Sequence, residues 1–257
     1  KSIATVAAHF PDIPHRGAIV DVIANGPKEE EFAGRAAAVL HIEPAAVEFF
    51  IALGRALAAA DAHDRGIAIC EALAREDGFS AAHAGSALLL HEQSDHTRAL
   101  AHLQKLSQAD RMVPEVAVLE AECHLALKQY AGALQADEVV SGGSPLMAAR
   151  AHEIAGQASL QMQTPDQALD HFFAALDFDV SSEPARQGLQ RLCESGQVLL
   201  WDLKTHFDQL YRDTARPAVV LQIAADLGEI DGVEELSQWA DTRRELLESN
   251  RQKGGGL

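Results

Sequence analysis

A small residue recurs in this chain every 33 to 35 positions. The segments that contain it otherwise differ, and the gaps between successive occurrences are 33, 33, 34 and 35 residues. The five positions are Ala33, Gly66, Ala99, Ala133 and Ala168. A fixed period of this length is typical of stacked repeat units, so it constrains the fold more than any single motif does.

Two further positions keep the same phase. Twelve residues before the small residue, four of five positions are small as well, with Asp21 as the exception: Gly54, Ala87, Ala121 and Gly156. Seven residues after it stands an apolar residue: Leu40, Leu73, Leu106, Val140 and Ala175. Small residues at matched places let two antiparallel helices approach closely, and one such hairpin cannot bury its apolar face alone. The pattern predicts an all-α superhelical solenoid of about five to seven helical hairpins.

The repeat resembles the tetratricopeptide repeat (TPR) family. Two segments carry the resemblance best: FIALGRALAAADAHDRGIAICEALAREDGF (50–79) and HEIAGQASLQMQTPDQALDHFFAALDFD (152–179). In the second, the family's small, small, aromatic and small positions are matched by Gly156, Ala168, Phe172 and Ala175. On this resemblance we place repeat units at about 14–46, 47–79, 80–113, 114–148 and 149–182. The first unit, with Asp21, and the fourth, with Asp137, depart from the family's pattern.

The ends of the chain fit the repeat less well. Residues 1–13 are expected to form a helical lead-in, and residues 249–257, which end in GGGL, a flexible tail or linker. Residues 183–248 are expected to form an irregular helical cap, in which 221–247 resembles another unit while 184–216 fits the repeat poorly.

Composition limits the partners. Lys and Arg number 21 against 38 Asp and Glu, which gives a net charge of −17 at pH 7. No stretch gathers enough basic residues to follow a phosphate backbone, so we expect neither nucleic acid nor an anionic membrane as partner. No segment approaches the length of an uncharged membrane span, and no signal peptide is recognisable at the start, so a cytoplasmic location is expected.

Three widely spaced cysteines, Cys70, Cys123 and Cys193, stand in apolar helical contexts. They form neither a CxxC motif nor a disulfide framework, and we expect reduced core residues.

The segment HEQSDH, residues 91–96, comes close to the HExxH motif of zinc peptidases. That motif places two histidines four residues apart on one helical face, whereas His91 and His96 are five apart. On an unbroken helix they would point about 140° apart, so the pair could share an ion only if the chain turned between them. In the repeat frame the segment is the turn of a hairpin, with Ser94 and Asp95 as helix breakers and Asp95 as a plausible N-cap. We therefore expect solvated turn residues and no metal site.

No other motif indicates catalysis. The chain lacks a GxSxG elbow, a phosphate-binding loop and a dinucleotide-binding glycine motif, so we expect no catalytic residue and no cofactor. Two aromatic groups, Phe172, Phe173 and Phe178 and then Trp201, Phe207 and Tyr211, lie at amphipathic spacing, which predicts core packing.

In the family, the first helix of each hairpin lines a concave groove. The matching positions predict an acidic patch beside an apolar strip, which suits a neutral to basic peptide or helix with apolar anchors. The groove residues chosen on this basis are Arg55, Leu88, His91, Glu115, Val118, Glu122, Leu125, Glu153, Gln157 and Leu160. The glutamates could equally form a solvated helix face that needs no partner.

The expected function is a noncatalytic protein–protein interaction scaffold, with homo-oligomerisation left open. The family's clamp for a C-terminal carboxylate is improbable. Among the positions that match the clamp, only Arg55 is basic, and Glu115 stands where a basic residue is needed. One alternative is the N-terminal domain of a larger enzyme, a glycosyltransferase or methyltransferase, where it would select substrate or mediate dimerisation. A small-molecule sensor would need a closed apolar pocket that the groove assignment does not provide.

Overall fold

The computed structural model describes residues 47–59, 61–75, 79–135, 140 and 144–254. The expected lead-in and the expected first unit, with Ala33, Leu40 and Asp21, lie outside the described residues, as does Asp137. The described part forms thirteen helices and no strand: α4 (Val47–Ala59), α5 (His63–Ala74), α6 (Ala82–Glu92), α7 (His96–Leu103), α8 (Gln108–Arg111), α9 (Pro114–Ala126), α10 (Tyr130–Ala133), α12 (Pro145–Gln161), α13 (Pro165–Phe178), α14 (Glu183–Glu194), α15 (Leu200–Asp213), α16 (Pro217–Leu227) and α17 (Glu235–Gly254).

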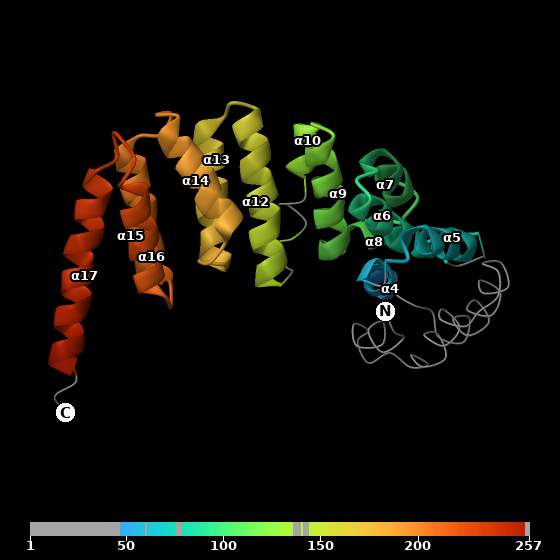
Figure 1. Cartoon of the computed structure of the whole chain (residues 1–257), viewed down its shortest axis with the longest axis horizontal. Helices are drawn as coiled ribbons and strands as arrows, with labels where there is room; N and C mark the ends of the chain where they lie inside the picture. The colour runs from blue at the N-terminus through green and yellow to red at the C-terminus, as the bar shows by residue number, and fades with distance from the viewer. Residues whose placement is uncertain (1–46, 60, 76–78, 136–139, 141–143, 255–257) are drawn as a thin grey trace. The chain divides into compact units, whose positions relative to one another are not determined.

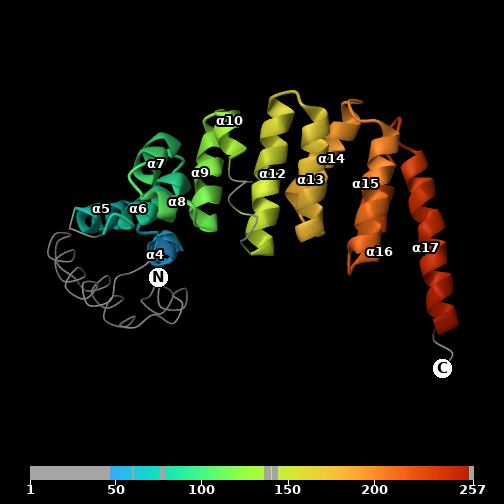
Figure 2. The same cartoon turned by 180° about the vertical axis from the view of Figure 1, so that it is seen from behind.

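The helices pack in chain order within two compact units, residues 1–140 and residues 141–257. In the first unit α6 packs against α4, α5, α7 and α9, and α9 also packs against α7 and α10. In the second unit α12 packs against α13, and α14 packs against α12, α13 and α16. Figure 1 shows α12 beside α13, and Figure 2 shows the same pair from behind. Each helix thus contacts near neighbours in sequence, which is the packing of a helical-hairpin solenoid and confirms the all-α prediction.

The hairpin turns repeat the same backbone geometry. A non-glycine residue with positive φ follows the first helix of four hairpins: Asp61 (59°), Ser94 (64°), Lys128 (60°) and Gln163 (59°). At each turn the next residue donates its N–H to the carbonyl five positions earlier, as Asp95 does to Leu90 at 2.9 Å and Gln129 to His124 at 2.8 Å. This is the Schellman arrangement that ends a helix through a left-handed residue.

The turn residues have the same period as the small residues found in the sequence. They are separated by 33, 34 and 35 positions, and each precedes a small residue by five: Gly66, Ala99, Ala133 or Ala168. Gly196, with φ of 63°, continues the series 33 residues after Gln163. The segment 184–216, which fits the repeat poorly by sequence, therefore keeps the left-handed residue of the repeat's turn.

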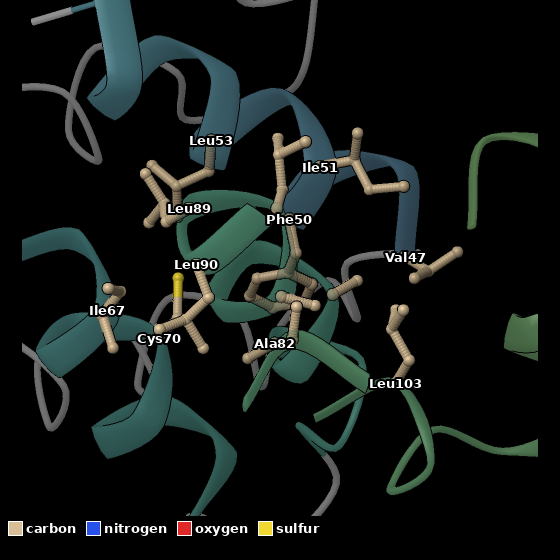
Figure 3. Packing of buried hydrophobic residues seen from close by; sticks show 14 of the residues in the cluster. Val47, Phe50, Ile51, Leu53, Ile67, Cys70, Ala82, Leu89, Leu90 and Leu103 are labelled. Atoms are coloured by element: carbon tan, nitrogen blue, oxygen red, sulfur yellow. The ribbon is translucent and has the colours of Figure 1, made fainter. Parts of the chain in front are cut away.

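The predicted small and apolar positions lie in the core. Among the described positions, all those twelve before, at and seven after the repeating small residue are buried, including Ala87, Leu73 and Ala175. In the first unit Phe50 of α4 is fully buried and points into a cluster that contains Leu90 and Ala82 of α6 (Figure 3). A Cβ on Gly85 would lie 2.9 Å from the Phe50 carbonyl oxygen, so a small residue is required where α4 meets α6.

The core of the second unit is built around Phe172 on α13. Its ring lies so close to Gly156 on α12 and to Gly188 on α14 that a Cβ would come within 2.6 Å of it at Gly156 and within 2.2 Å at Gly188. One aromatic ring therefore joins three helices, and it can do so only because two of them carry glycine at the contact.

Two predictions about aromatic residues are corrected. Phe172, Phe173 and Phe207 are buried as expected, but Phe178 is 46% exposed and Trp201 is 75% exposed. Each lies at the end of its helix, Phe178 as the last residue of α13 and Trp201 in the first turn of α15, so periodicity alone overstates burial there.

The C-terminal helix also differs from the expected boundaries. α17 continues to Gly254 and thus includes most of the segment expected to be a flexible tail. Glu, Arg, Gln and Lys favour helix, and they continue the helix through that segment. None of the helices in the described part combines the length and the apolar character needed to cross a bilayer.

Candidate functional site

The turn between α6 and α7 brings two histidines together. His91 is the half-buried penultimate residue of α6, and His96 is the first residue of α7. Because Ser94 takes a left-handed conformation between them, the chain reverses, and the two imidazole ring centres lie 5.1 Å apart. Asp95 caps α7 by accepting the N–H of Arg98 at 3.2 Å, which confirms the predicted N-cap.

Helix α9 adds a thiol and a carboxylate to this pair. The Cys123 Sγ lies 3.6 Å from His91 Nδ1, and the Glu122 Oε2 lies 3.5 Å from His91 Nε2. One ligand atom from each of His91, His96 and Cys123 can be chosen so that all three lie within 4.8 Å of one another. We call these three residues the His–His–Cys cluster. Its members come from three helices of the first unit, α6, α7 and α9.

The surroundings of the cluster favour the neutral forms of Cys123 and His96. Burial raises the pKa of the Cys123 thiol to about 12, with Glu122 and Glu120 adding to the effect. Partial burial lowers the pKa of His96, and His91 lowers it further against the opposite effects of Asp95 and Glu122. At neutral pH the cluster therefore presents a protonated thiol and a neutral His96.

The cluster leaves one polar atom unsatisfied. His96 Nδ1 is shielded from solvent and has no hydrogen-bond partner. A shielded polar atom without a partner costs about 1–3 kcal/mol, so it needs a physical explanation.

A catalytic Cys–His pair is the first alternative for this geometry. A nucleophilic cysteine must be a thiolate that its substrate can reach. Cys123 is fully buried, and its raised pKa keeps the sulfur protonated, so the residue meets neither condition. A bound metal ion would meet both objections, because it displaces the proton and needs no passage for a substrate.

The spacing argument from sequence did not find this cluster. His91 and His96 point apart on a continuous helix, but the turn at Ser94 removes the continuity. Cys123 lies 32 residues from His91, and only stacking of the next hairpin brings the two into contact. The available signal was the combination of HEQSDH in a turn with a cysteine about one repeat later.

The predicted groove residues of the first unit lie on α4, α6 and α9, and α6 packs against both α4 and α9. Arg55 is exposed, while His91, Glu115, Glu122 and Leu125 are half-buried. Leu88 and Val118 are buried, so they belong to the packing between helices and not to an exposed apolar strip. For Leu88 the reason is its contact with α4, where a Cβ on Gly54 would lie 3.0 Å from its side chain.

Glu153, Gln157 and Leu160 belong to the second unit, on α12. Glu153 is only 7% exposed. Its carboxylate accepts a hydrogen bond from the Ser182 hydroxyl at 2.5 Å and from Arg150 at 3.0 Å. Ser182 in turn caps α14, so Glu153 links α12 to α14 inside the unit. Gln157 and Leu160 are half-buried.

A second pair of histidines, His83 and His102, forms a hydrogen-bonded chain with Glu71. His83 Nδ1 lies 3.0 Å from His102 Nδ1, and His102 Nε2 lies 3.3 Å from the Glu71 carboxylate. If His102 donates Nε2–H to Glu71, its neutral ring can only accept at Nδ1, and His83 then donates. This arrangement explains how two imidazoles pack without repulsion.

Three hollows on the described surface are small. Those beside Glu120, beside Gln187 and beside His206 measure about 190, 240 and 260 Å³. Pockets for small organic ligands usually span about 300–1,000 Å³, so these hollows give little support to a small-molecule sensor.

Comparison with known proteins gives no match from which a family could be assigned. The chain matches no protein-family model, and no curated protein matches it. The structure by itself defines an all-α protein of stacked helical hairpins.

Proposed function

We propose that this chain is a noncatalytic protein-interaction module of TPR-like repeats, and that the first helices of its first unit bind a segment of a partner protein. The observation that carries the proposal is the adjacency of α4, α6 and α9. They bring exposed Arg55 and half-buried Glu115, Glu122 and Leu125 onto consecutive first helices. We call the surface that α4, α6 and α9 present through these residues the first-helix face.

The chemistry of this face suits a peptide or helix with a basic group and an apolar anchor. Glu115 and Glu122 are seven residues apart on α9, so they share one side of that helix. Leu125 is half-buried on the same helix and supplies apolar contact. A stack of packed helices is already ordered before binding, so most of the ordering entropy falls on the partner.

Only the first unit is assigned to this role. Arg150 pairs with the charge of Glu153 and Ser182 donates a hydrogen bond to it, so drawing Glu153 toward a partner would break both interactions. The residues proposed for binding are therefore Arg55, Glu115, Glu122 and Leu125.

Site-specific photo-cross-linking tests the proposal. A photo-reactive amino acid is placed at position 55 or 115 in the full chain and, as matched controls, at the exposed positions 75 and 104. We expect one partner to cross-link from 55 and 115 and not from 75 or 104, and mass spectrometry then gives its contact peptide. That peptide should bind Glu115→Lys at least about threefold more weakly than wild type, while Gln104→Lys binds normally.

Two outcomes would contradict the proposal. Cross-links from the control positions alone would move the interaction to another surface, and a second copy of this chain as the partner would make the module an oligomerisation domain. Position 122 is left unchanged because it adjoins the His–His–Cys cluster, so this test does not depend on metal.

A further inference from the structure

The His–His–Cys cluster has the donor set of a transition-metal site. Imidazole nitrogen and thiolate sulfur are the ligands that Zn²⁺ takes most often in proteins, whereas Mg²⁺ and Ca²⁺ require oxygen. The three donors come from separate helices, α6, α7 and α9, so an ion would join two neighbouring hairpins.

The distances are close to those around a bound zinc ion. With Zn–N near 2.0–2.1 Å and Zn–S near 2.3 Å, the edges of a tetrahedral site measure roughly 3.3 to 3.6 Å. The separation of His91 Nδ1 from Cys123 Sγ, 3.6 Å, already equals such an edge. One choice of ligand atoms keeps all three residues within 4.8 Å of one another, and side-chain rotation of half-buried His96 can close the remaining gap of about 1 Å.

Glu122 completes the arrangement from outside. If His91 binds the ion through Nδ1, its Nε2–H faces the Glu122 carboxylate at 3.5 Å. A carboxylate behind a metal-bound histidine sets its tautomer and strengthens it as a ligand. Glu122 is thus a positioning residue, and the fourth ligand would be a water molecule.

The alternative is a structural cluster that needs no ion. That alternative leaves the shielded His96 Nδ1 without a hydrogen-bond partner. A metal ion would supply it, because a neutral imidazole nitrogen offers its lone pair to the ion without needing a hydrogen-bond donor.

We propose that His91, His96 and Cys123 bind a single Zn²⁺ ion that fastens the turn between α6 and α7 to α9. On binding, the Cys123 S–H bond breaks, its proton passes to the buffer, and the thiolate sulfur forms a bond to zinc. The site does not depend on the proposed interaction with a partner protein.

Titration of the full chain with Zn²⁺ and Co²⁺ tests this site. After removal of metal with a chelator, calorimetry should show one Zn²⁺ per chain and release of about one proton, seen as an enthalpy that changes with the buffer. Co²⁺ should give the thiolate-to-metal charge-transfer band and the intense visible bands of a tetrahedral site. Mg²⁺ should not bind at this cluster, because it requires oxygen ligands.

The variants separate the ligands from their surroundings. Cys123→Ser should abolish the charge-transfer band and weaken zinc binding more than any other change. Glu122→Gln should weaken binding about 10- to 100-fold and keep the band, as expected of a residue that orients a ligand. Cys193→Ser, which removes a buried thiol of the second unit, should bind zinc like wild type. His96→Asn is the further ligand variant if Cys123→Ser does not fold, as judged by circular dichroism.

The proposal is overturned if the chain binds no zinc at stoichiometric concentrations. It is equally overturned if Cys123→Ser and His96→Asn bind as tightly as wild type, or if Co²⁺ binds without the sulfur band. Each of these results would leave the interaction proposal untouched, since that test changes neither the ligands nor Glu122.

Discussion

At the scale of single residues, the polar groups of the first unit are arranged so that neutral histidines pack against each other. His83 and His102 do so through an Nδ1–H···Nδ1 hydrogen bond, and His102 Nε2 faces the Glu71 carboxylate. Burial, together with His102 and Lys105, lowers the pKa of His83 to about 4, against the raising effect of Glu71. Burial and Lys105 lower the pKa of His102 as well, with a smaller opposing effect of Glu71.

The pair predicts a loss of stability in mild acid. Between about pH 4 and the ordinary histidine pKa of 6.5, the unfolded chain binds more protons than the folded chain, so stability rises with pH. The pair's contribution is fully present above pH 6.5 and is lost as pH falls toward 4. Urea unfolding at a series of pH values should show this slope in wild type and a shallower one in His83→Gln.

Lys105→Gln provides the matched check on the cause. Because Lys105 lowers both pKa values, its neutralisation should raise them and reduce the pH dependence while both histidines stay in place. An identical slope in wild type and both variants would show that the acid sensitivity comes from carboxylates elsewhere.

At the scale of elements, the hairpin turns are built from left-handed residues that are not glycine. Asp61, Ser94, Lys128 and Gln163 all have φ near 60°. A residue with a Cβ pays about 1–2 kcal/mol for this conformation, and aspartate tolerates it better than lysine or glutamine. The turns therefore hold conformational strain at a fixed point of every repeat, which the Schellman hydrogen bonds and the helix packing offset.

Replacing Lys128 by glycine should stabilise the protein. Glycine removes the left-handed penalty at the cost of about 0.5–1 kcal/mol of extra chain entropy, so we expect a gain of roughly 0.5–1 kcal/mol in the free energy of unfolding. Denaturant unfolding measures it. Ala101→Gly, at an exposed position within α7, should instead lose about 1 kcal/mol. If both glycines destabilise equally, the turn carries no strain.

At the scale of the whole molecule, the chain divides into two units with separate cores. In each unit, helices contact helices that are near in sequence. The stability of each helix therefore depends on its contacts with its neighbours, as in other repeat proteins. Some of the carboxylates behind the net charge of −17 are paired with a cation of their own unit: Glu71 with Arg98, Glu120 with Arg111 and Glu153 with Arg150.

A change at Gly188 should reveal this neighbour-to-neighbour stability. Gly188→Ala places a Cβ in the space of the Phe172 ring, and overpacking of this kind costs about 1–3 kcal/mol against about 1 kcal/mol gained in helix propensity. Hydrogen exchange of the full chain should show lost protection in α14 and its neighbours α12, α13 and α16, with α4 to α9 unchanged.

A double change identifies the cause of that loss. Phe172→Leu combined with Gly188→Ala should be less destabilised than the sum of the two single variants, because the smaller side chain makes room for the new methyl group. Additive effects, or equal loss of protection in both units, would contradict the packing described for Phe172.

The sequence was sufficient for everything that depends on local periodicity. It identified the all-α class, the hairpin period, the buried small residues such as Gly156 and Ala99, and the cap at Asp95, because each follows from residues a few turns apart on the same chain segment. The TPR resemblance and the partner-binding role remain predictions. Only tertiary structure placed Glu153 against Ser182 and Cys123 against His91, since those pairs are 29 and 32 residues apart and meet through stacking of separate hairpins. Periodicity says which face of a helix a residue occupies; the stack decides what lies opposite that face, and there the candidate metal site arises.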